Sequence, residues 1–345
     1  MIFLRPIQYT KKTFISCFIT FIITIIIITM IARMPMSRAF STIRDCVTQH
    51  PIRLKMSLPN SDLITSTKSN TVKKIQTLLT KRKSRTEIKQ TVVEGPKMIF
   101  DLLKNEKTRA LVHQVIVSVD RPEWIAELKE KYSDNLIVLQ GTQEVLTACS
   151  DTVTPQGIVA TVSIPPEPSK VTPPPSHQTP PLYLVLDGVS DPGNLGALLR
   201  SSVATGVAGV LLLPCCCDAW NPKAVRSAMG CSFQLPMLQV DSMDHAQQVL
   251  SDWQVQDIYA ATMEDGTVSF PHYDVDWTHH ATAILIGNEG NGLSDVARNK
   301  VRSGEIKSVH VPMEAGIESL NAAVCGSVIL FEYMRQCRKS PSKKI

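Results

Sequence analysis

The sequence has no two cysteines at Cys-x-x-Cys spacing, although it contains nine cysteines in 345 residues. Zinc sites are commonly built from such pairs, and here the count is odd and the spacing irregular. We therefore expect reduced thiols and no bound metal. The run Cys215–Cys217 follows the apolar segment Gly209–Leu213, so we predict small buried or half-buried side chains there rather than ligands.

Acidic residues are scarce at the N-terminal end, where residues 1–100 contain 4 Asp and Glu against 17 Lys and Arg, a balance of +13. The other residues carry 19 basic and 27 acidic side chains, so the formal charge of the whole chain is only +5. Basic segments of this kind are typical of organelle-import sequences and of arms that contact phosphates, and a solvated flank has the same composition. The charge alone leaves these three interpretations open.

Charged residues are also absent from residues 13–32, a run of twenty mostly apolar positions. Such a run is long enough to span a bilayer, so a membrane anchor is one interpretation. A cleaved bipartite presequence is another, and an extended gene model with translation from Met34 or Met36 is the third. The stretch after Met34 has Arg and Ser but few acidic residues, as organellar transit peptides do.

The composition beyond these absences is typical of a globular protein, with 43% hydrophobic and 19% charged residues. The length is enough for two domains. We predict a presequence and basic tether over residues 1–86, a small α/β domain over 87–163, a linker over 164–181 that contains eight prolines, and a larger α/β domain over 182–340.

In the larger domain, continuous apolar runs such as Leu182–Leu186 alternate with helical patterns. Such runs are typical of strands in a parallel sheet that is covered on both faces. Ligands of these sheets bind beyond the carboxyl ends of the strands. The loops that follow the strands are therefore the candidate sites.

The first candidate loop spans residues 187–200 and contains the turn signal Asp191-Pro-Gly. Asn194 is a candidate helix cap, and Arg200 would lie on the second turn of the helix. By itself this pattern also fits a capped helix with one surface arginine.

Two further loops have their own signatures. The loop 285–294 is rich in glycine, which lets a ligand approach the backbone, but it has neither Gly-Lys-Ser/Thr nor Gly-x-Gly-x-x-Gly. Two common nucleotide-binding loops are thereby disfavoured. The loop 311–321 leads into an apolar helix over Leu320–Cys337, with Ser319 as a candidate cap, and this helix must be buried in its domain or against another subunit.

Together the three loops resemble, in order, the three motifs of the SpoU/TrmH family of RNA ribose 2′-O-methyltransferases, part of the SPOUT class. The resemblance runs through residues 182–337 and includes residues 221–230, Asn-Pro-Lys-Ala-Val-Arg-Ser-Ala-Met-Gly. Residues 87–162, with Val93-Glu94-Gly95, resemble the family's ribosomal-protein-like substrate-binding domain. The nearest likeness is to the ribosomal RNA guanosine-2′-O-methyltransferases of bacteria and mitochondria.

This resemblance implies an α/β fold in which a SPOUT-type parallel sheet ends in a C-terminal trefoil knot and is preceded by the small domain. It implies a homodimer and S-adenosylmethionine as the methyl donor, with no metal. Backbone groups of Gly287, Val311 and Leu320 would hold the donor.

The resemblance also implies which residues act in catalysis. Arg200 matches the family's catalytic arginine, and Asn194, Glu289, Ser319 and Asn321 would line the same site. Arginine stays protonated in proteins, so we expect it to clamp the target phosphate and stabilise the developing oxyanion rather than act as a simple base.

The expected partner is RNA, most specifically a guanosine of large ribosomal RNA in an organelle, with the mitochondrion favoured over the plastid. Lys223 and Arg226 are expected to contact its phosphates, together with the small domain and the basic tether. A transfer RNA 2′-O-methyltransferase and a non-catalytic RNA-binding ribosome-assembly factor are the alternatives. Membrane association through residues 13–32 also stays open.

Overall fold

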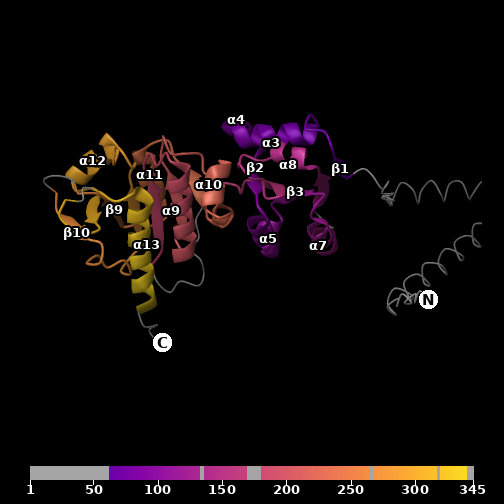
Figure 1. Ribbon diagram of the computed structural model, residues 1–345. Coiled ribbons are helices and arrows are strands. Elements are labelled where there is room, and N and C mark those ends of the chain that lie inside the picture. The colour runs from indigo at the N-terminus through magenta and orange to yellow at the C-terminus, as the bar shows by residue number, and fades with distance from the viewer. Residues whose placement is uncertain (1–61, 133–135, 169–179, 264–266, 317–318, 340–345) are drawn as a thin grey trace, which may run out of the picture. The chain divides into compact units, whose positions relative to one another are not determined.

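The computed structural model describes residues 62–132, 136–168, 180–263, 267–316 and 319–339 (Figure 1). Residues from Asp62 onwards belong to one compact unit. The expected presequence, the apolar run 13–32 and residues 169–179 of the proline-rich linker lie outside the described residues. In the part of the chain that is described, no helix is long and apolar enough to cross a membrane.

The first part of this unit is a small domain built on a mixed five-stranded sheet with the strand order β1-β4-β3-β5-β2. Strands β1, β3 and β4 run parallel, whereas β5 pairs antiparallel with both β2 and β3. The elements of this domain are β1 (Leu63–Ile64), α3 (Asn70–Thr80), α4 (Arg82–Ile88), β2 (Gln90–Glu94), α5 (Pro96–Lys104), α6 (Glu106–Arg109), β3 (Val112–Ser118), α7 (Pro122–Tyr132), β4 (Ile137–Gly141), α8 (Gln143–Ala148) and β5 (Ile158–Ser163).

The expectation that residues up to 86 form an unstructured tether is wrong for the stretch after residue 62, because α3 and α4 are part of the small domain. Ser69 caps α3 by accepting a hydrogen bond from the amide of Val72. Val72, Ile75 and Leu78 recur every three residues on one face of the helix and are fully buried. The surrounding Lys, Thr and Gln hide this narrow apolar stripe in the sequence.

The second part contains a seven-stranded sheet with the order β10-β12-β9-β11-β6-β7-β8, in which every pair is parallel. The predicted parallel sheet is therefore confirmed. Its elements are β6 (Leu182–Leu186), α9 (Pro192–Thr205), β7 (Gly209–Leu212), α10 (Pro222–Ser227), the 3-10 helix η1 (Cys231–Gln234), β8 (Met237–Gln239), α11 (Met243–Asp252), β9 (Asp257–Ala261), β10 (Ser269–Pro271), β11 (Thr282–Ile286), α12 (Asp295–Arg302), β12 (Lys307–His310) and α13 (Ala322–Lys339).

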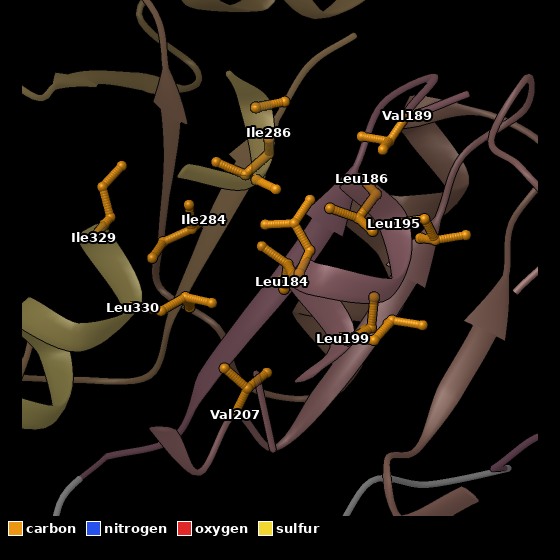
Figure 2. Close-up of a cluster of buried hydrophobic side chains, with 14 of the residues drawn as sticks. Leu184, Leu186, Val189, Leu195, Leu199, Val207, Ile284, Ile286, Ile329 and Leu330 are labelled. Carbon is orange, nitrogen blue, oxygen red and sulfur yellow. The ribbon is translucent and has the colours of Figure 1, made fainter. Parts of the chain in front are cut away.

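The two central strands, β6 and β11, are buried at every position because helices cover both faces of the sheet. Alternate residues of a strand point to opposite faces. On one face, Leu184 and Ile284 pack with Leu199 of α9 and with Ile329 and Leu330 of α13 (Figure 2). Burying each such side chain stabilises the fold by about 1.5–3 kcal/mol.

The opposite face of the sheet is covered by α11 and α12. Val185 and Leu285 of the central strands pack there with Leu250 of α11 and Val301 of α12. This covering explains why the central strands read as continuous apolar runs, and it leaves the carboxyl ends of the strands to carry polar loops.

The hydrophobic core of the small domain includes side chains from the larger one. Val225 of α10 and Phe233 of η1 are buried in the same cluster as Met98 and Val93 of the small domain. The ring centroids of Trp220 and Phe233 lie 5.4 Å apart at this junction. The two domains are therefore joined by a shared core as well as by the linker.

The cysteine run after β7 is only partly as predicted. Cys216 is buried and Cys217 is half-buried, but Cys215 is exposed. Cys215 has a φ of 66°, since the chain turns sharply there after leaving the sheet. Burial raises the pKa of the Cys216 thiol to about 11, so this thiol stays protonated at neutral pH.

Candidate functional site

A cavity of about 350 Å³ lies beyond the carboxyl ends of β9, β11 and β12. Gly287, Val311 and Leu320, the three residues expected to hold a cofactor, all line it, as do Glu289 and Ser319. The other residues of the lining are Ala261, Thr262, Met263, Ile286, Asn288, Gly290, Gly292, Leu293, His310, Met313, Ala322 and Cys325. The second and third candidate loops thus meet at one cavity with a mixed polar and apolar wall.

The second loop is folded tightly around Asn288. The backbone amide and carbonyl of Asn288 exchange hydrogen bonds with Gly292 at 2.8 and 3.0 Å. Its side-chain oxygen accepts from the amides of Gly290 and Asn291, and its side-chain nitrogen donates to the carbonyl of Gly188 at 2.8 Å. Asn288 therefore shapes the loop and ties it to the first loop.

Gly287 allows this fold because a Cβ there would lie 2.6 Å from the carbonyl carbon and oxygen of Gly292. Asp187, at the end of β6, holds the far side of the loop by accepting a hydrogen bond of 2.8 Å from the amide of Ser294. Neither Asp187 nor Asn288 was among the predicted site residues. The available signal was an Asn two residues before a Gly, the spacing of a side-chain-stabilised turn.

A chain of side-chain hydrogen bonds joins all three loops at the edge of the cavity. The side-chain amide nitrogen of Asn194 donates to Oε1 of Glu289 at 2.7 Å. The side-chain amide nitrogen of Asn321 donates to Oδ1 of Asn194 at 3.0 Å. Three of the predicted catalytic residues are thereby brought into direct contact.

The caps of the two helices beside this chain differ from the prediction. Asp191, not Asn194, caps α9, because its Oδ1 accepts a hydrogen bond of 2.9 Å from the backbone amide of Asn194. Asn321, not Ser319, caps α13, since its oxygen accepts from the amides of Ala323 and Val324. Asn194 is therefore free of a capping role and turns its side chain to Glu289.

Arg200 lies on the exposed surface of α9, one to two turns after Asn194, and does not line the cavity. Within the described ranges it makes no hydrogen bond or ion pair. Burial raises the pKa of the Cys231 thiol in η1, and the positive charge of Arg200 partly opposes this shift. Among the described residues, Arg200 therefore has no direct hydrogen bond to Asn194, Glu289 or Asn321.

The two residues expected to contact RNA differ in their surroundings. Lys223 is exposed on α10, and its side chain has no partner among the described residues. Arg226 forms a bidentate ion pair with Asp151 of the small domain through both guanidinium ends. Among the residues placed by the structure, no group of three or more His, Cys, Asp and Glu could hold a metal ion.

Comparison with known proteins agrees with this architecture. Residues 181–331 match the SpoU rRNA Methylase family, and residues 69–160 match the MRM3-like substrate binding domain. The mitochondrial rRNA methyltransferase 3 of Mus musculus is 32% identical over 305 residues, which cover 76% of this chain and 72% of that protein. The 23S rRNA (guanosine(2553)-2′-O)-methyltransferase RlmP of Bacillus subtilis is 26% identical over 268 residues, covering 78% and 97%.

Solved structures show the same likeness. An AdoMet-bound rRNA methyltransferase from Sinorhizobium meliloti has a TM-score of 0.63 at 26% identity and covers 79% of this chain and 97% of that one. The SpoU methyltransferase AviRb from Streptomyces viridochromogenes, in complex with AdoMet, has a TM-score of 0.66 at 25% identity, with coverage of 79% and 99%.

These matches and the loop-lined cavity place the protein among the RNA methyltransferases. More narrowly, the chain belongs to the SpoU rRNA methylase family, and the resemblance of its three loops to the family motifs is confirmed. The start of the substrate-binding match at residue 69 agrees with the inclusion of α3 in the small domain.

Proposed function

We propose that the protein transfers the methyl group of S-adenosylmethionine to the ribose 2′-oxygen of a guanosine in organellar, most specifically mitochondrial, ribosomal RNA. The observation that carries the proposal is the contact of Asn194, Glu289 and Asn321 at the rim of the 350 Å³ cavity. The mitochondrial relatives and the small domain that matches a substrate-binding domain support the substrate.

The cavity suits the methyl donor in size and chemistry. Small-molecule sites of about 300–1,000 Å³ commonly combine apolar walls with a few fixed polar groups. Here Leu293 and Ile286 supply apolar surface, and Gly287 and Val311 line the same wall, where their backbone groups can hydrogen-bond the donor. When bound, S-adenosylmethionine supplies a methyl group already activated by a positive sulfur, so the protein needs mainly to orient the two reactants.

We assign the polar chain an orienting role. Glu289 accepts from Asn194, which accepts from Asn321, so each side chain holds the next in one rotamer. A fixed carboxylate at the rim can accept a hydrogen bond from a ribose hydroxyl and position it. Ser319 is exposed in the lining and can add a second hydrogen bond.

Arg200 is assigned to the RNA rather than to the donor. It is exposed, it lies outside the cavity, and it is not engaged by the described residues. A free guanidinium binds a phosphate with two parallel hydrogen bonds and stabilises negative charge as it develops on the attacking oxygen. Arginine stays protonated at neutral pH and does not act as a base, so we assign the hydroxyl proton to the oxygen of the clamped phosphate as the 2′-oxygen takes the methyl group.

Dimerisation and the trefoil knot complete the proposal. Val324 and Phe331 of α13 are 50% and 45% exposed, and their spacing of seven residues puts them on one face of the helix. This apolar face suits burial against a second copy. The parallel order of β9, β11 and β12 around the cavity is compatible with a knot formed by the second and third loops.

A methyl-transfer assay with labelled S-adenosylmethionine and in-vitro transcripts of organellar ribosomal RNA tests the proposal directly. Incorporation at a single guanosine, with loss of that ribose methyl from cells that lack the protein, is the expected result. Preferential methylation of transfer RNA would replace the substrate. Failure to bind the donor in calorimetric titration would favour a non-catalytic assembly factor.

A further inference from the structure

Two neighbouring residues of α10 contact partners in two different parts of the protein. Arg226 holds both carboxylate oxygens of Asp151 in the small domain. Ser227 donates from its hydroxyl to the carbonyl of Gly193 in the first loop at 2.7 Å. Helix α10 therefore connects the small domain to the first turn of α9, which carries Asn194.

The small-domain end of this connection is held rigidly. Asp151 lies between Ser150 and Thr152, whose hydroxyls donate to the two oxygens of Glu94 at 2.7 and 3.0 Å. Glu94 is only 5% exposed. A buried carboxylate with two hydroxyl donors fixes its partners, so Asp151 is presented to Arg226 in one orientation.

The other end is equally constrained. At Gly196 an added Cβ would lie 2.4 Å from the carbonyl oxygen of Ala224, so α9 and α10 are in direct backbone contact. Gly193 is followed by Asn194, whose side chain binds Glu289. A shift of α10 would therefore move the asparagine that orients the glutamate.

We propose that Arg226 and Ser227 are positioning residues that couple the orientation of the RNA-reading small domain to the Asn194–Glu289 pair. This inference rests on the proposed function. The small domain binds the RNA. The Arg226–Asp151 ion pair and the shared core at Val225 and Phe233 together fix the angle at which that domain meets α10. The hydroxyl of Ser227 then ties α10 to Gly193 in the first turn of α9. In this assignment the guanidinium of Arg226 binds Asp151 and does not contact an RNA phosphate.

The first experiment compares Arg226→Gln, Asp151→Asn and the double variant. Each single substitution breaks the same ion pair, so each should lower kcat by about tenfold. The double variant should lose no more than either single variant. The KM for RNA and the dissociation constant for S-adenosylmethionine should stay within twofold. The salt dependence of RNA binding should not change.

The second experiment tests the hydrogen bond from Ser227 to Gly193. Ser227→Ala removes the hydroxyl and should also lower kcat by about tenfold, while Ser227→Thr keeps the hydroxyl and should restore most of the rate. The matched control for Asp151→Asn is Glu127→Gln, since it removes a carboxylate from the exposed ion pair with Lys131 within α7 of the small domain. This control should keep the wild-type kcat.

Opposite behaviour of the two partners would overturn the inference. If Arg226 binds a phosphate, Arg226→Gln weakens RNA binding and reduces the slope of log K against log salt by about 0.9, whereas Asp151→Asn leaves or strengthens binding. Single variants with wild-type kcat would overturn it as well. An inactive wild-type protein instead overturns the proposed function, so the two failures are distinguishable.

Discussion

The side-chain amide of Asn194 donates to Oε1 of Glu289 across 95 positions of the sequence, at 2.7 Å. This contact joins the first loop to the second at the rim of the cavity. Asn194 itself does not line the cavity. The orienting role that we propose for Asn194 can therefore be tested separately from binding of the methyl donor.

We expect Asn194→Ala to lower kcat by about 10–100-fold, because the glutamate loses the donor that orients it. The affinity for S-adenosylmethionine should remain within threefold. Single-turnover methylation and calorimetric titration measure the two quantities. An equal loss of affinity and rate would contradict the orienting role.

Arg200→Ala should abolish most methyl transfer, by about 100-fold or more, since it removes the charge that stabilises the developing oxyanion. Donor affinity and the unfolding midpoint should not change, because the side chain is exposed and outside the cavity. Arg200→Lys should recover part of the rate without bidentate binding. Near-normal turnover by the alanine variant would refute the assignment.

Gly287→Ala should weaken binding of S-adenosylmethionine by about tenfold or more, because its Cβ would overlap the carbonyl of Gly292 at 2.6 Å and displace the loop. Gly290→Ala is the graded comparison, since a Cβ at that position meets no atom closer than 3.7 Å. It should cause a clearly smaller loss. Equal affinities of the two variants would show that the tight turn is not needed for binding.

Leu78→Ala should lower the free energy of unfolding by about 2–5 kcal/mol, as expected for a fully buried leucine in a packed core. Gln76→Ala, two positions earlier on the exposed face of α3, should change it by less than about 0.5 kcal/mol. Urea unfolding of the two variants provides the measurement. Equal stabilities would remove α3 from the folded domain.

Asp257, at the start of β9, should make stability depend on pH. Burial raises the pKa of its carboxyl, but hydrogen bonds of 2.7 Å from Lys307 and His280 outweigh this and lower it overall. A lowered pKa in the folded state stabilises the protein above the pKa of the unfolded chain, and this contribution is lost as the pH falls.

Asp257→Asn should therefore reduce the free energy of unfolding at pH 7 by an amount on the order of 1 kcal/mol, and the difference should shrink below about pH 4. Denaturant unfolding at a series of pH values checks the trend. A difference that stays constant down to pH 3 would contradict the role of the charge.

The sequence predicts the larger sheet well because its central strands are covered on both faces. Leu182–Leu186 and Thr282–Ile286 contain no position that faces water, so hydrophobicity alone marks them. Helix α3 is covered on one side only, and three apolar residues among lysines and threonines do not separate it from a tether. The short edge strand β10 carries an exposed Phe270 and was likewise not predicted.

The sequence indicated which loops line the cavity, but not the contacts between their side chains. The order of the three loops identified Gly287, Val311 and Leu320, which share the cavity wall. Hydrogen bonds over long sequence separation, such as Asn321 to Asn194, leave no local pattern. The ion pair of Arg226 with Asp151 was not predicted for the same reason, because the sequence around an arginine does not show whether a carboxylate lies beside it in the fold.

The shared core at Val225 and Phe233 has a practical consequence for engineering. A graft that exchanges only the residues before the proline-rich stretch would leave the buried side chains of Val225 and Phe233 without the small-domain residues that cover them. A chimera that carries another small domain will therefore need α10 and η1 exchanged together with that domain.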